Sequence, residues 1–358
     1  MNMKVKANRK ELLQAAERAM KVTRKSYDTT SLEECFLFEV DGEGITLHAC
    51  TQVAYLKTGC AYTAADGTFS CAFPYDQFVA TLKTARSETV VLELLDHKVQ
   101  LSGGRIRLQI PCMDPKAWPK EPSFGDPDYE LPAGELLGAF RECSHSLPAG
   151  ENVLPVLGSY CVECTKEHWK VTSMDGRRIS IRGDIRGSAV TQNLLQGLKL
   201  APVLGIFGDG ARLAFCGEDA MLYDAQSTVY FRTVDGRYFD VERLLVKPAY
   251  TVTVSREELQ EAFTLALGIL PSNEPARLVM DQDLLRVQAV GNASLDCEIP
   301  AAFAGERKRA IPIGLNPKYL LDALKTLERE TVTVQVGDAC VIMEEDQRLE
   351  LICLCRIR

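Results

Sequence analysis

The sequence lacks any run of about 18 uncharged apolar residues, the length that a membrane-spanning helix needs. It also lacks an excess of positive charge, because 41 Lys and Arg against 49 Asp and Glu give a net charge of −8. As an average over 358 residues, this balance argues against a nucleic-acid-binding protein, whose contact surface is usually basic. The N-terminal segment MNMKVKANRKELL carries charges where a secretory signal needs apolar residues, so we expect a cytoplasmic protein.

Motifs of common enzymes are also missing. The chain contains no GxSxG, P-loop, GxGxxG or HExxH sequence, and only four histidines. We therefore expect a non-catalytic protein without a cofactor. An enzyme remains the rival hypothesis, because 13 cysteines and four histidines make some Cys/His pair available.

Metal-binding patterns are scarce. Cys161-x-x-Cys164 is the one metal-like pair, and it has neither a second CxxC nor a nearby His partner. The pair lies in the apolar stretch VLGSYCVECT, which predicts a buried strand rather than a zinc site. We expect no metal, and we interpret the 13 cysteines as reduced thiols.

What the chain does contain is an internal repeat. The pattern L-K-T-x3-E-T-V occurs at residues 82–90 and again at 324–332, 242 positions later. The pattern E-L-x-x-A begins at Glu11, Glu135 and Glu258, at about half that spacing. Together these matches predict three tandem repeats of about 120 residues that account for the whole chain.

Each repeat opens with a short strand, such as 4–7 or 250–254, followed by a helix that carries E-L-x-x-A. These first helices are predicted at 9–25, 133–147 and 255–270. Second helices are predicted at 75–85 and 317–327, with Asn316 as the N-cap of the latter. The middle repeat has three glycines between 205 and 210, so its second helix is predicted to be short. Asp-Gly pairs such as 175–176 predict tight turns between strands.

Two motifs and the repeat resemble one family. Thr172-x-Met174-Asp175-Gly176-Arg177-Arg178-Ile179 is similar to T-x-T-D-G-x-R-L, and residues 234–240, VDGRYFD, are similar to V-D-G-R-F-P-D. These are motifs of the bacterial replicative sliding clamp, the beta subunit of DNA polymerase III. The chain resembles this family from about Lys4 to its C-terminus, as a main clamp or as a divergent paralogue.

The resemblance implies an α+β fold of three clamp-type repeats with boundaries at 1–126, 127–247 and 248–358. Each repeat has two helices and antiparallel sheets, and a head-to-tail homodimer forms a closed ring (the DNA clamp fold). Such a ring encircles duplex DNA without reading sequence and acts as a processivity factor in DNA replication. The implied partners are the polymerase III catalytic subunit, the clamp loader and other proteins with a short apolar motif.

Charge placement indicates which helices face DNA. Residues 9–25 carry a net charge of +4, and 74–87 and 316–329 carry +1 each, whereas 133–147 and 255–270 are acidic. The candidate DNA-binding residues are Lys10, Arg18, Lys21, Arg24, Lys25, Lys83, Arg86 and Lys325. The alternative is that about half of them are merely solvated cations. The acidic helices also leave open a clamp-like interaction scaffold that encircles DNA weakly or not at all.

The family takes partner peptides in a groove between its second and third repeats. The resemblance implies a lining of Leu157, Met174, Gly176, Arg177, Arg178, Ile179, Phe239, Arg243, Leu244, Leu354, Cys355 and Arg356. Apolar walls of this kind accept Leu or Phe anchors. Phe239 replaces the family's proline, and the C-terminal tail departs from the usual M-P-M-R-L pattern. The alternatives are local ion pairs for Arg178 and Arg243 and a plain hairpin turn at Asp175-Gly176.

The ring interface would join the third repeat of one chain to the first repeat of another. Its candidate residues are Ile106 and Leu108 on one side and Ile269 and Leu270 on the other. The alternative is that all four belong to the core within one chain.

Overall fold

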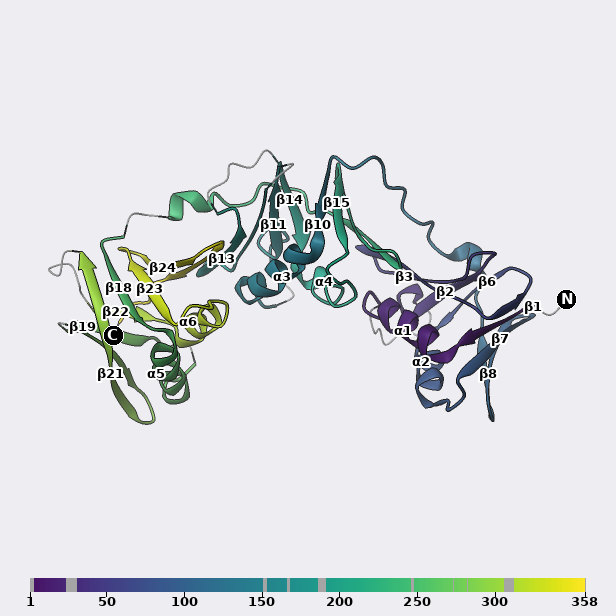
Figure 1. Cartoon of the computed structure of the whole chain (residues 1–358), viewed down its shortest axis with the longest axis horizontal. Helices are drawn as coiled ribbons and strands as arrows, with labels where there is room; N and C mark the ends of the chain where they lie inside the picture. The colour runs from purple at the N-terminus through teal and green to yellow at the C-terminus, as the bar shows by residue number, and fades with distance from the viewer. Residues whose placement is uncertain are drawn as a thin grey trace. The chain divides into compact units, whose positions relative to one another are not determined.

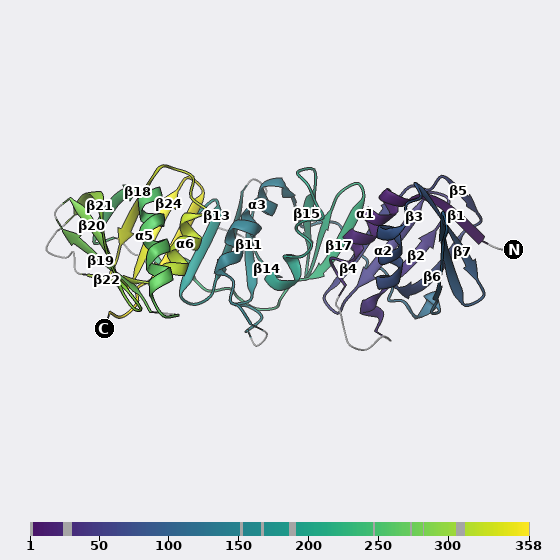
Figure 2. The same cartoon turned by 90° about the horizontal axis from the view of Figure 1, so that it is seen from below.

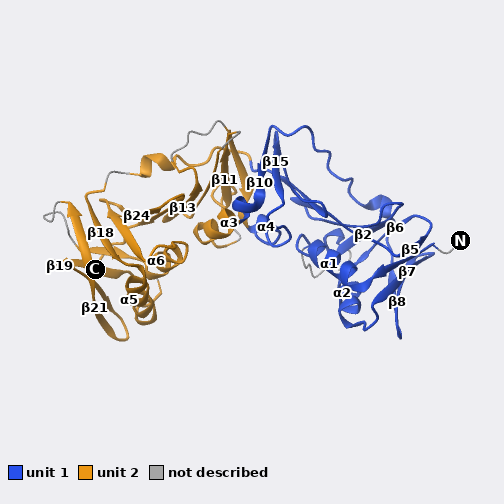
Figure 3. Cartoon of the chain, viewed as in Figure 1, with its two compact units in different colours: residues 1–137, 198–234 blue, residues 138–197, 235–358 orange. Residues whose placement is uncertain are grey.

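The computed structural model describes residues 3–23, 31–150, 153–165, 168–185, 191–245, 248–272, 274–281, 283–305 and 312–357. The chain forms two compact units (Figure 3). Unit 1 comprises residues 1–137 and 198–234, and unit 2 comprises residues 138–197 and 235–358. The middle part of the sequence thus contributes to both units, and the three-repeat boundaries remain a prediction.

Unit 1 contains a five-stranded sheet, β5-β1-β7-β8-β9, and an eight-stranded sheet, β10-β15-β16-β17-β4-β3-β2-β6 (Figure 1). Its strands are β1 (Met3–Asn8), β2 (Cys35–Val40), β3 (Ile45–Cys50), β4 (Ala54–Cys60), β5 (Ala64–Asp66), β6 (Phe69–Pro74), β7 (Thr89–Leu95), β8 (Lys98–Gly103), β9 (Ile106–Pro111), β10 (Tyr129–Pro132), β15 (Arg212–Cys216), β16 (Asp219–Tyr223) and β17 (Ser227–Arg232). Its helices are α1 (Arg9–Ala19), α2 (Tyr75–Thr84), η1 (Leu32–Glu34) and η2 (Pro115–Ala117).

Unit 2 is built on a twelve-stranded sheet, β14-β11-β12-β13-β25-β24-β23-β18-β21-β20-β19-β22. Its strands are β11 (Ser159–Cys164), β12 (Trp169–Met174), β13 (Arg178–Gly183), β14 (Thr191–Gln196), β18 (Tyr250–Ser255), β19 (Ala276–Asp281), β20 (Leu284–Val290), β21 (Ser294–Gly305), β22 (Ile313–Leu315), β23 (Thr331–Val336), β24 (Cys340–Glu345) and β25 (Arg348–Cys353). Its helices are α5 (Arg256–Ile269), α6 (Pro317–Leu324), η3 (Ser144–Ser146) and η4 (Val241–Leu244). The boundary between the units passes through α3 (Ala133–Cys143) and α4 (Gly197–Leu200).

The first helix begins where the sequence predicts and ends earlier. The Asn8 side chain accepts hydrogen bonds from the backbone N–H groups of Lys10 and Glu11, which caps the N-terminus of α1. The predicted end at residue 25 was wrong. After Ala19 the backbone tightens into i→i+3 hydrogen bonds, and the turn buries Val22 instead of continuing the helix. Helix α1 packs against α2, as Figure 2 shows from below.

The other predicted helices are confirmed, with shorter ends. Helix α6 is capped by Asn316 and begins at Pro317, and α5 lies within one residue of its predicted bounds at each end. Helix α3 ends at Cys143, where η3 replaces its last predicted turn. In the middle of the chain α4 has only four residues, so the prediction of a short helix is confirmed.

Each large sheet crosses a predicted repeat boundary. In unit 1, β17 pairs with β4, and in unit 2, β13 pairs with β25. The β13–β25 junction holds a buried ion pair: Arg182 Nη2 lies 2.6 Å from Glu350 Oε1, and both side chains are almost fully buried. Arg182 Nε also lies 2.7 Å from Glu142 Oε2. A buried charge is tolerated only when it is paired in this way, so the junction fixes the two strands in register.

The Cys161/Cys164 pair lies in β11, and both side chains are about 1% exposed, which confirms the prediction of a buried strand. Among the residues that the structure describes, no cluster of His, Cys, Asp and Glu has the arrangement of a metal site. The described helices also include none that is long and apolar enough to cross a membrane.

Candidate peptide groove, basic helices and strand edges

The turn between β12 and β13 presents one arginine to solvent and buries the next. The Asp175 carboxylate accepts hydrogen bonds from the backbone N–H groups of Arg177 and Arg178 at 2.9 and 3.0 Å. Gly176 has a φ of 83°, a conformation that favours glycine. The predicted hairpin turn is therefore confirmed, and it leaves Arg177 exposed beside a buried Arg178.

Arg178 attaches this turn to α6. Its Nε lies 3.0 Å from Asp175 Oδ2, and its Nη1 lies 3.0 Å from Asp322 Oδ2. The guanidinium also lies 4.3 Å from the centroid of the Tyr319 ring, within cation–π distance. Arg178 therefore forms ion pairs within the chain, as the alternative interpretation states. The pair with Asp322 joins the β12–β13 turn to α6, 144 residues later in the sequence, and the two form one wall.

The C-terminal tail forms the adjoining wall. Cys353 N–H donates to Arg177 O, Leu354 N–H to Ala339 O, and Cys355 N–H to Gly314 O, each at 2.8 Å. These bonds fasten three consecutive residues to three different segments of unit 2. The tail is therefore held beside the β12–β13 turn, with the side chain of Arg356 exposed.

Three thiols line this corner of unit 2. Cys340 and Cys353 are register partners on β24 and β25, and Cys355 follows two residues later. Burial raises the pKa of each thiol above its ordinary value. They are therefore protonated at neutral pH and behave as small apolar side chains.

The remaining predicted groove residues lie on separate segments. Met174 and Ile179 are buried at the ends of β12 and β13, whereas Leu157 is half-buried. Phe239 and Leu244 are 45% and 44% exposed, which is unusual for such large apolar side chains. Arg243 is exposed, and its Nε lies 2.8 Å from Asp240 Oδ2. It therefore also forms a local ion pair, as the alternative interpretation states.

The candidate DNA-binding cations are mostly exposed. Lys10 and Lys21 are exposed on or just after α1, and Lys83 and Arg86 are exposed on or just after α2. Lys83 Nζ lies 3.0 Å from Glu17 Oε1, which joins α2 to α1. Arg18, on α1, is half-buried. In unit 2, Lys325 Nζ lies 3.5 Å from Asp322 Oδ1. Arg24 and Lys25 lie outside the described residues.

The candidate interface residues lie on one strand edge and at the end of one helix. Ile106 and Leu108 lie half-buried on β9, the edge strand of the five-stranded sheet. Ile269 and Leu270 lie half-buried at the end of α5, against the core of unit 2. Part of the surface of Ile269 and of Leu270 is therefore buried in the core of their own chain, as the alternative states.

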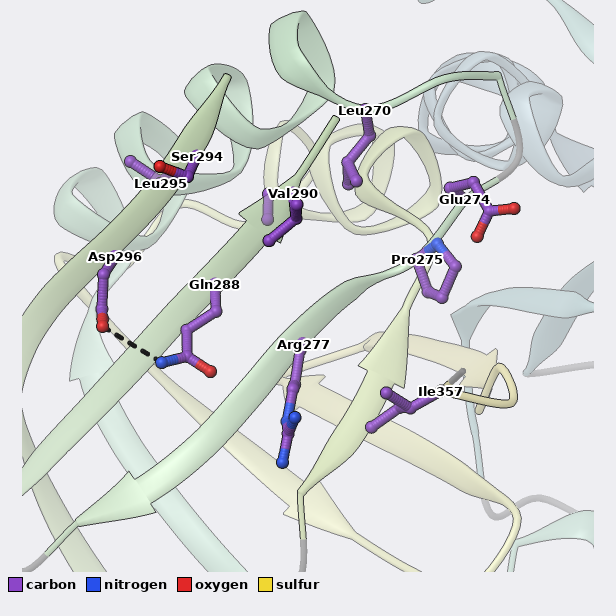
Figure 4. A pocket seen from close by; sticks show the side chains of 11 residues that line it. Leu270, Glu274, Pro275, Arg277, Gln288, Val290, Ser294, Leu295, Asp296 and Ile357 are labelled. Atoms are coloured by element: carbon purple, nitrogen blue, oxygen red, sulfur yellow. Dashed lines mark hydrogen bonds between the residues drawn. The ribbon is translucent and has the colours of Figure 1, made fainter. Parts of the chain in front are cut away.

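Leu270 also lines an open pocket with a volume of about 610 Å³ in unit 2 (Figure 4). Strand β21 forms one side of it, and in the part of the chain that the structure describes, residues 294–300 of β21 pair with β20 alone. Val290, 78% exposed, and Leu295 present apolar surface there. Asp296, which accepts a hydrogen bond from Gln288, adds a negative charge.

The architecture was compared with that of known proteins. No family model matches the chain. The chain is 25% identical to the beta sliding clamp of Vibrio cholerae over 75% of its own length and 76% of that protein. The DNA polymerase III beta subunit of Thermotoga maritima superposes with a TM-score of 0.88 at 20% identity, over 99% of this chain and 100% of that chain. The Helicobacter pylori beta clamp bound to a DNA ligase peptide superposes with a TM-score of 0.87 at 18% identity, over 99% and 100% of the two chains.

This chain has the sliding-clamp fold. The predicted resemblance to the DNA polymerase III beta subunit and the predicted α+β clamp fold are confirmed. The match extends over essentially the whole chain, so no large part of the sequence lies outside the sliding-clamp fold.

Several residues beside the candidate groove of this sliding-clamp fold were not predicted from the sequence. Tyr319 and Asp322 lie on α6, which was predicted, but nothing local shows that one face of α6 meets Arg178. Cys340 was missed because its pairing with Cys353 depends on strand register. The available signal was the cap at Asn316, which fixes where α6 begins and therefore which of its residues share a face.

Proposed function

We propose that the chain is a DNA sliding clamp that encircles duplex DNA and tethers a replicative DNA polymerase to its template. The single observation that carries this proposal is the superposition of nearly the whole chain on DNA polymerase III beta subunits. A clamp needs no base contacts, because a closed ring retains DNA by topology and touches phosphates only loosely. It acts in the cytoplasm as a non-catalytic processivity subunit and uses no cofactor or metal.

Duplex DNA passes along the basic helices. Lys10, Lys21 and Lys83 supply exposed positive charge on or beside α1 and α2, and Arg18, Arg86 and Lys325 add to it. Cations on these surfaces attract phosphates without fixing a register, as sliding requires. Arg24 and Lys25 follow α1 in the sequence and add two positive charges to this segment.

Partner proteins dock a short apolar motif against the surface formed by the β12–β13 turn, α6 and the tail. The partners are the polymerase III catalytic subunit, the clamp loader and other proteins with such a motif. Apolar surface is supplied by the exposed side chains of Phe239 and Leu244 and by the thiols of Cys353 and Cys355. Exposed Arg177 supplies a donor for polar atoms of the peptide.

Two chains close the ring through the strand edges. Strand β9 of one chain adds to the unpaired edge of β21 in its partner, so that Ile106 and Leu108 cover the pocket beside Leu270. Charge supports this pairing: β9 carries exposed Arg107, and residues 294–300 of β21 carry exposed Asp296 and Glu298.

A second candidate function is a clamp-like interaction scaffold with weak or no DNA encirclement. Helix α5 favours it, because Glu257, Glu258 and Glu261 oppose the single basic Arg256. The Nε of Arg256 moreover donates to Arg329 O, which holds that guanidinium beside the bend that precedes β23.

Primer extension distinguishes the two functions. A bacterial replicative polymerase and clamp loader are supplied with a long, singly primed circular template, with and without the chain. We expect the chain to lengthen the products of a single binding event, as judged with excess competitor template. Unchanged product length, with a known clamp as the positive control, would contradict the proposed function.

A further inference from the structure

Unit 1 contains an open pocket of about 420 Å³ outside all the sites described above. It is lined by the β3–β4 turn at residues 50–55, by the linker at 119–124, and by parts of β16 and β17. All of these residues belong to unit 1. The pocket is large enough for the anchor side chains of a short peptide.

The turn that lines this pocket has the same register as the turn at the candidate groove. Cys50 pairs with Tyr55 across the β3–β4 turn, and Met174 pairs with Ile179 across the β12–β13 turn, each position 124 residues later. Thr51 Oγ1 accepts a hydrogen bond from Ala54 N–H at 3.3 Å, as the Asp175 carboxylate does from Arg178 N–H.

The neighbouring strands match as well. Strand β17 pairs with β4 as β25 pairs with β13. Asp219 of β16 pairs with Arg232 of β17, and Cys340 of β24 pairs with Cys353 of β25. The two pairs occupy equivalent positions, because each residue of the second pair comes 121 positions after its counterpart in the first. A short helix occurs at a similar place in each case: η2 comes just before residues 119–124, and η4 is the helix before β18. The pocket is thus the repeat-related counterpart of the candidate peptide groove.

Its lining differs from that of the groove in one decisive way. Ala54 stands where Arg178 would be, so no guanidinium fills this position. An aromatic wall takes its place: the ring centroids of Tyr55 and Tyr230 lie 6.3 Å apart, and those of Phe124 and Tyr230 lie 6.5 Å apart. Tyr230 is held by a hydrogen bond of 3.0 Å from its hydroxyl to Glu121 Oε1. The wall is therefore preorganised for an apolar anchor.

Charged side chains at the rim of the pocket determine which residue of a bound peptide is favoured next to its apolar anchor. Lys120 is exposed, and the side chain of Arg232 is 73% exposed, with its guanidinium 3.6 Å from Glu218. Lys120, Arg232 and Asp219 are the charged residues that line the pocket, while Glu218 beside it pairs with Arg232 and Glu121 pairs with Lys57, which leaves Lys120 as the cation that faces the opening without an ion pair of its own among the described residues. A ligand with a carboxylate beside its apolar anchor complements this arrangement.

We propose that this pocket is a second peptide-docking site, which takes a short extended segment of a partner protein with an aromatic or aliphatic anchor next to an acidic residue. The inference rests on the proposed function in one respect only, that the related groove in unit 2 binds peptides. One chain would then hold two partner segments at once, through surfaces of different chemistry.

A photocrosslinking experiment on the full chain tests this site. The probe is a short synthetic peptide with an Asp-Leu-Phe core and a flanking benzophenone residue, and crosslinked positions are mapped by mass spectrometry. We expect crosslinks within 50–55 or 119–124 in addition to crosslinks near 174–179. Lys120→Glu and Arg232→Glu should each weaken crosslinking in unit 1 about tenfold, a loss equivalent to about 1.4 kcal/mol. Both side chains are exposed, so neither variant should unfold the chain.

The matched control is Lys98→Glu, an equal charge change at an exposed position outside the lining, which should change nothing. Crosslinks confined to the groove in unit 2 would overturn this inference and leave the proposed function standing. Crosslinks confined to unit 1 would support the inference and count against the groove, and crosslinks at neither site would overturn both. If a second copy of the chain covers the pocket instead, Lys120→Glu will change the solution mass and the peptide will leave no crosslink there, which also overturns the proposal.

Discussion

Arg182 and Glu350 form the buried ion pair at the β13–β25 junction. Glu350 is 1% exposed, and burial by itself raises the pKa of its carboxyl. Hydrogen bonds from His145 and Ser180 and the charge of Arg182 outweigh burial, so the pKa of Glu350 lies below its ordinary value. The carboxylate is therefore ionised in the folded chain and neutralises an otherwise buried guanidinium.

Glu350→Gln should destabilise the chain by about 3–5 kcal/mol, because it leaves Arg182 buried with only Glu142 as a charged partner. Urea denaturation followed by circular dichroism measures this loss. The control Glu43→Gln, at an exposed position, should change the free energy of unfolding by less than about 0.5 kcal/mol. Equal stability of the two variants would mean that the ion pair does not support the junction.

The same carboxyl predicts a pH dependence. Because the pKa of Glu350 is lower in the folded chain than in the unfolded chain, its contribution to stability is present above the unfolded pKa of about 4.3 and is lost as the pH falls below it. We expect the stability difference between the wild type and Glu350→Gln to shrink as the pH falls below that value. A difference that grows with acidification would contradict the lowered pKa.

At the scale of elements, the sequence predicts helices better than it predicts the contacts between strands. The E-L-x-x-A pattern and Asn316 fix where α1, α5 and α6 begin, because caps and apolar spacing are local signals. The end of α1 was not predicted, because the turn of i→i+3 hydrogen bonds that follows Ala19 and contains buried Val22 has no local signal in the sequence. The pairings of β4 with β17 and of β13 with β25 join strands some 170 residues apart, and no local period encodes them.

The C-terminal tail is an element whose removal tests the candidate groove. Deleting residues 354–358 removes the N–H donors that fasten the tail to Ala339 and Gly314, while β25 itself ends at Cys353. We expect the variant to stay folded and to lose binding of a peptide with apolar anchors, measured by fluorescence anisotropy. Arg356→Ala is the milder companion variant, which keeps the tail's backbone bonds. Unchanged affinity after the deletion would remove the tail from the groove.

The edges of β9 and β21 make a prediction of their own. Arg107→Glu should convert a dimer into a monomer in sedimentation experiments, because it places a negative charge opposite Asp296 and Glu298. Adding Asp296→Arg should restore the dimer by reversing the pair. A wild-type monomer at micromolar concentration, or a double variant no better than the single one, would refute this interface.

At the scale of the whole molecule, the net charge of −8 no longer argues against DNA. The exposed lysines of α1 and α2 provide local positive charge in an acidic chain. The fold followed from the repeat and from two short motifs, whereas the candidate sites needed side-chain positions: Arg178, predicted as a groove residue, binds Asp322 and Tyr319 within the chain. Such a role cannot be derived from spacing, since the three residues meet only through tertiary packing.

Reversal of charge on α1 should affect retention on DNA rather than folding. Lys10→Glu with Lys21→Glu changes two exposed side chains, so stability should be almost unchanged. If each lysine neutralises one phosphate, the slope of log K against log salt should fall by about 0.9 for each lysine that is replaced. Retention with the same salt dependence as the wild type would mean that this face of α1 does not meet DNA.

The central claim, encirclement of DNA, is tested most directly by topology. The chain is loaded with a clamp loader onto a nicked circular plasmid, isolated by gel filtration, and the plasmid is then cut at one site. A closed ring predicts that the protein stays on the circle and leaves after the cut, because it slides off the new ends. Equal retention on circular and linear DNA, or no retention on the circle, would contradict the claim.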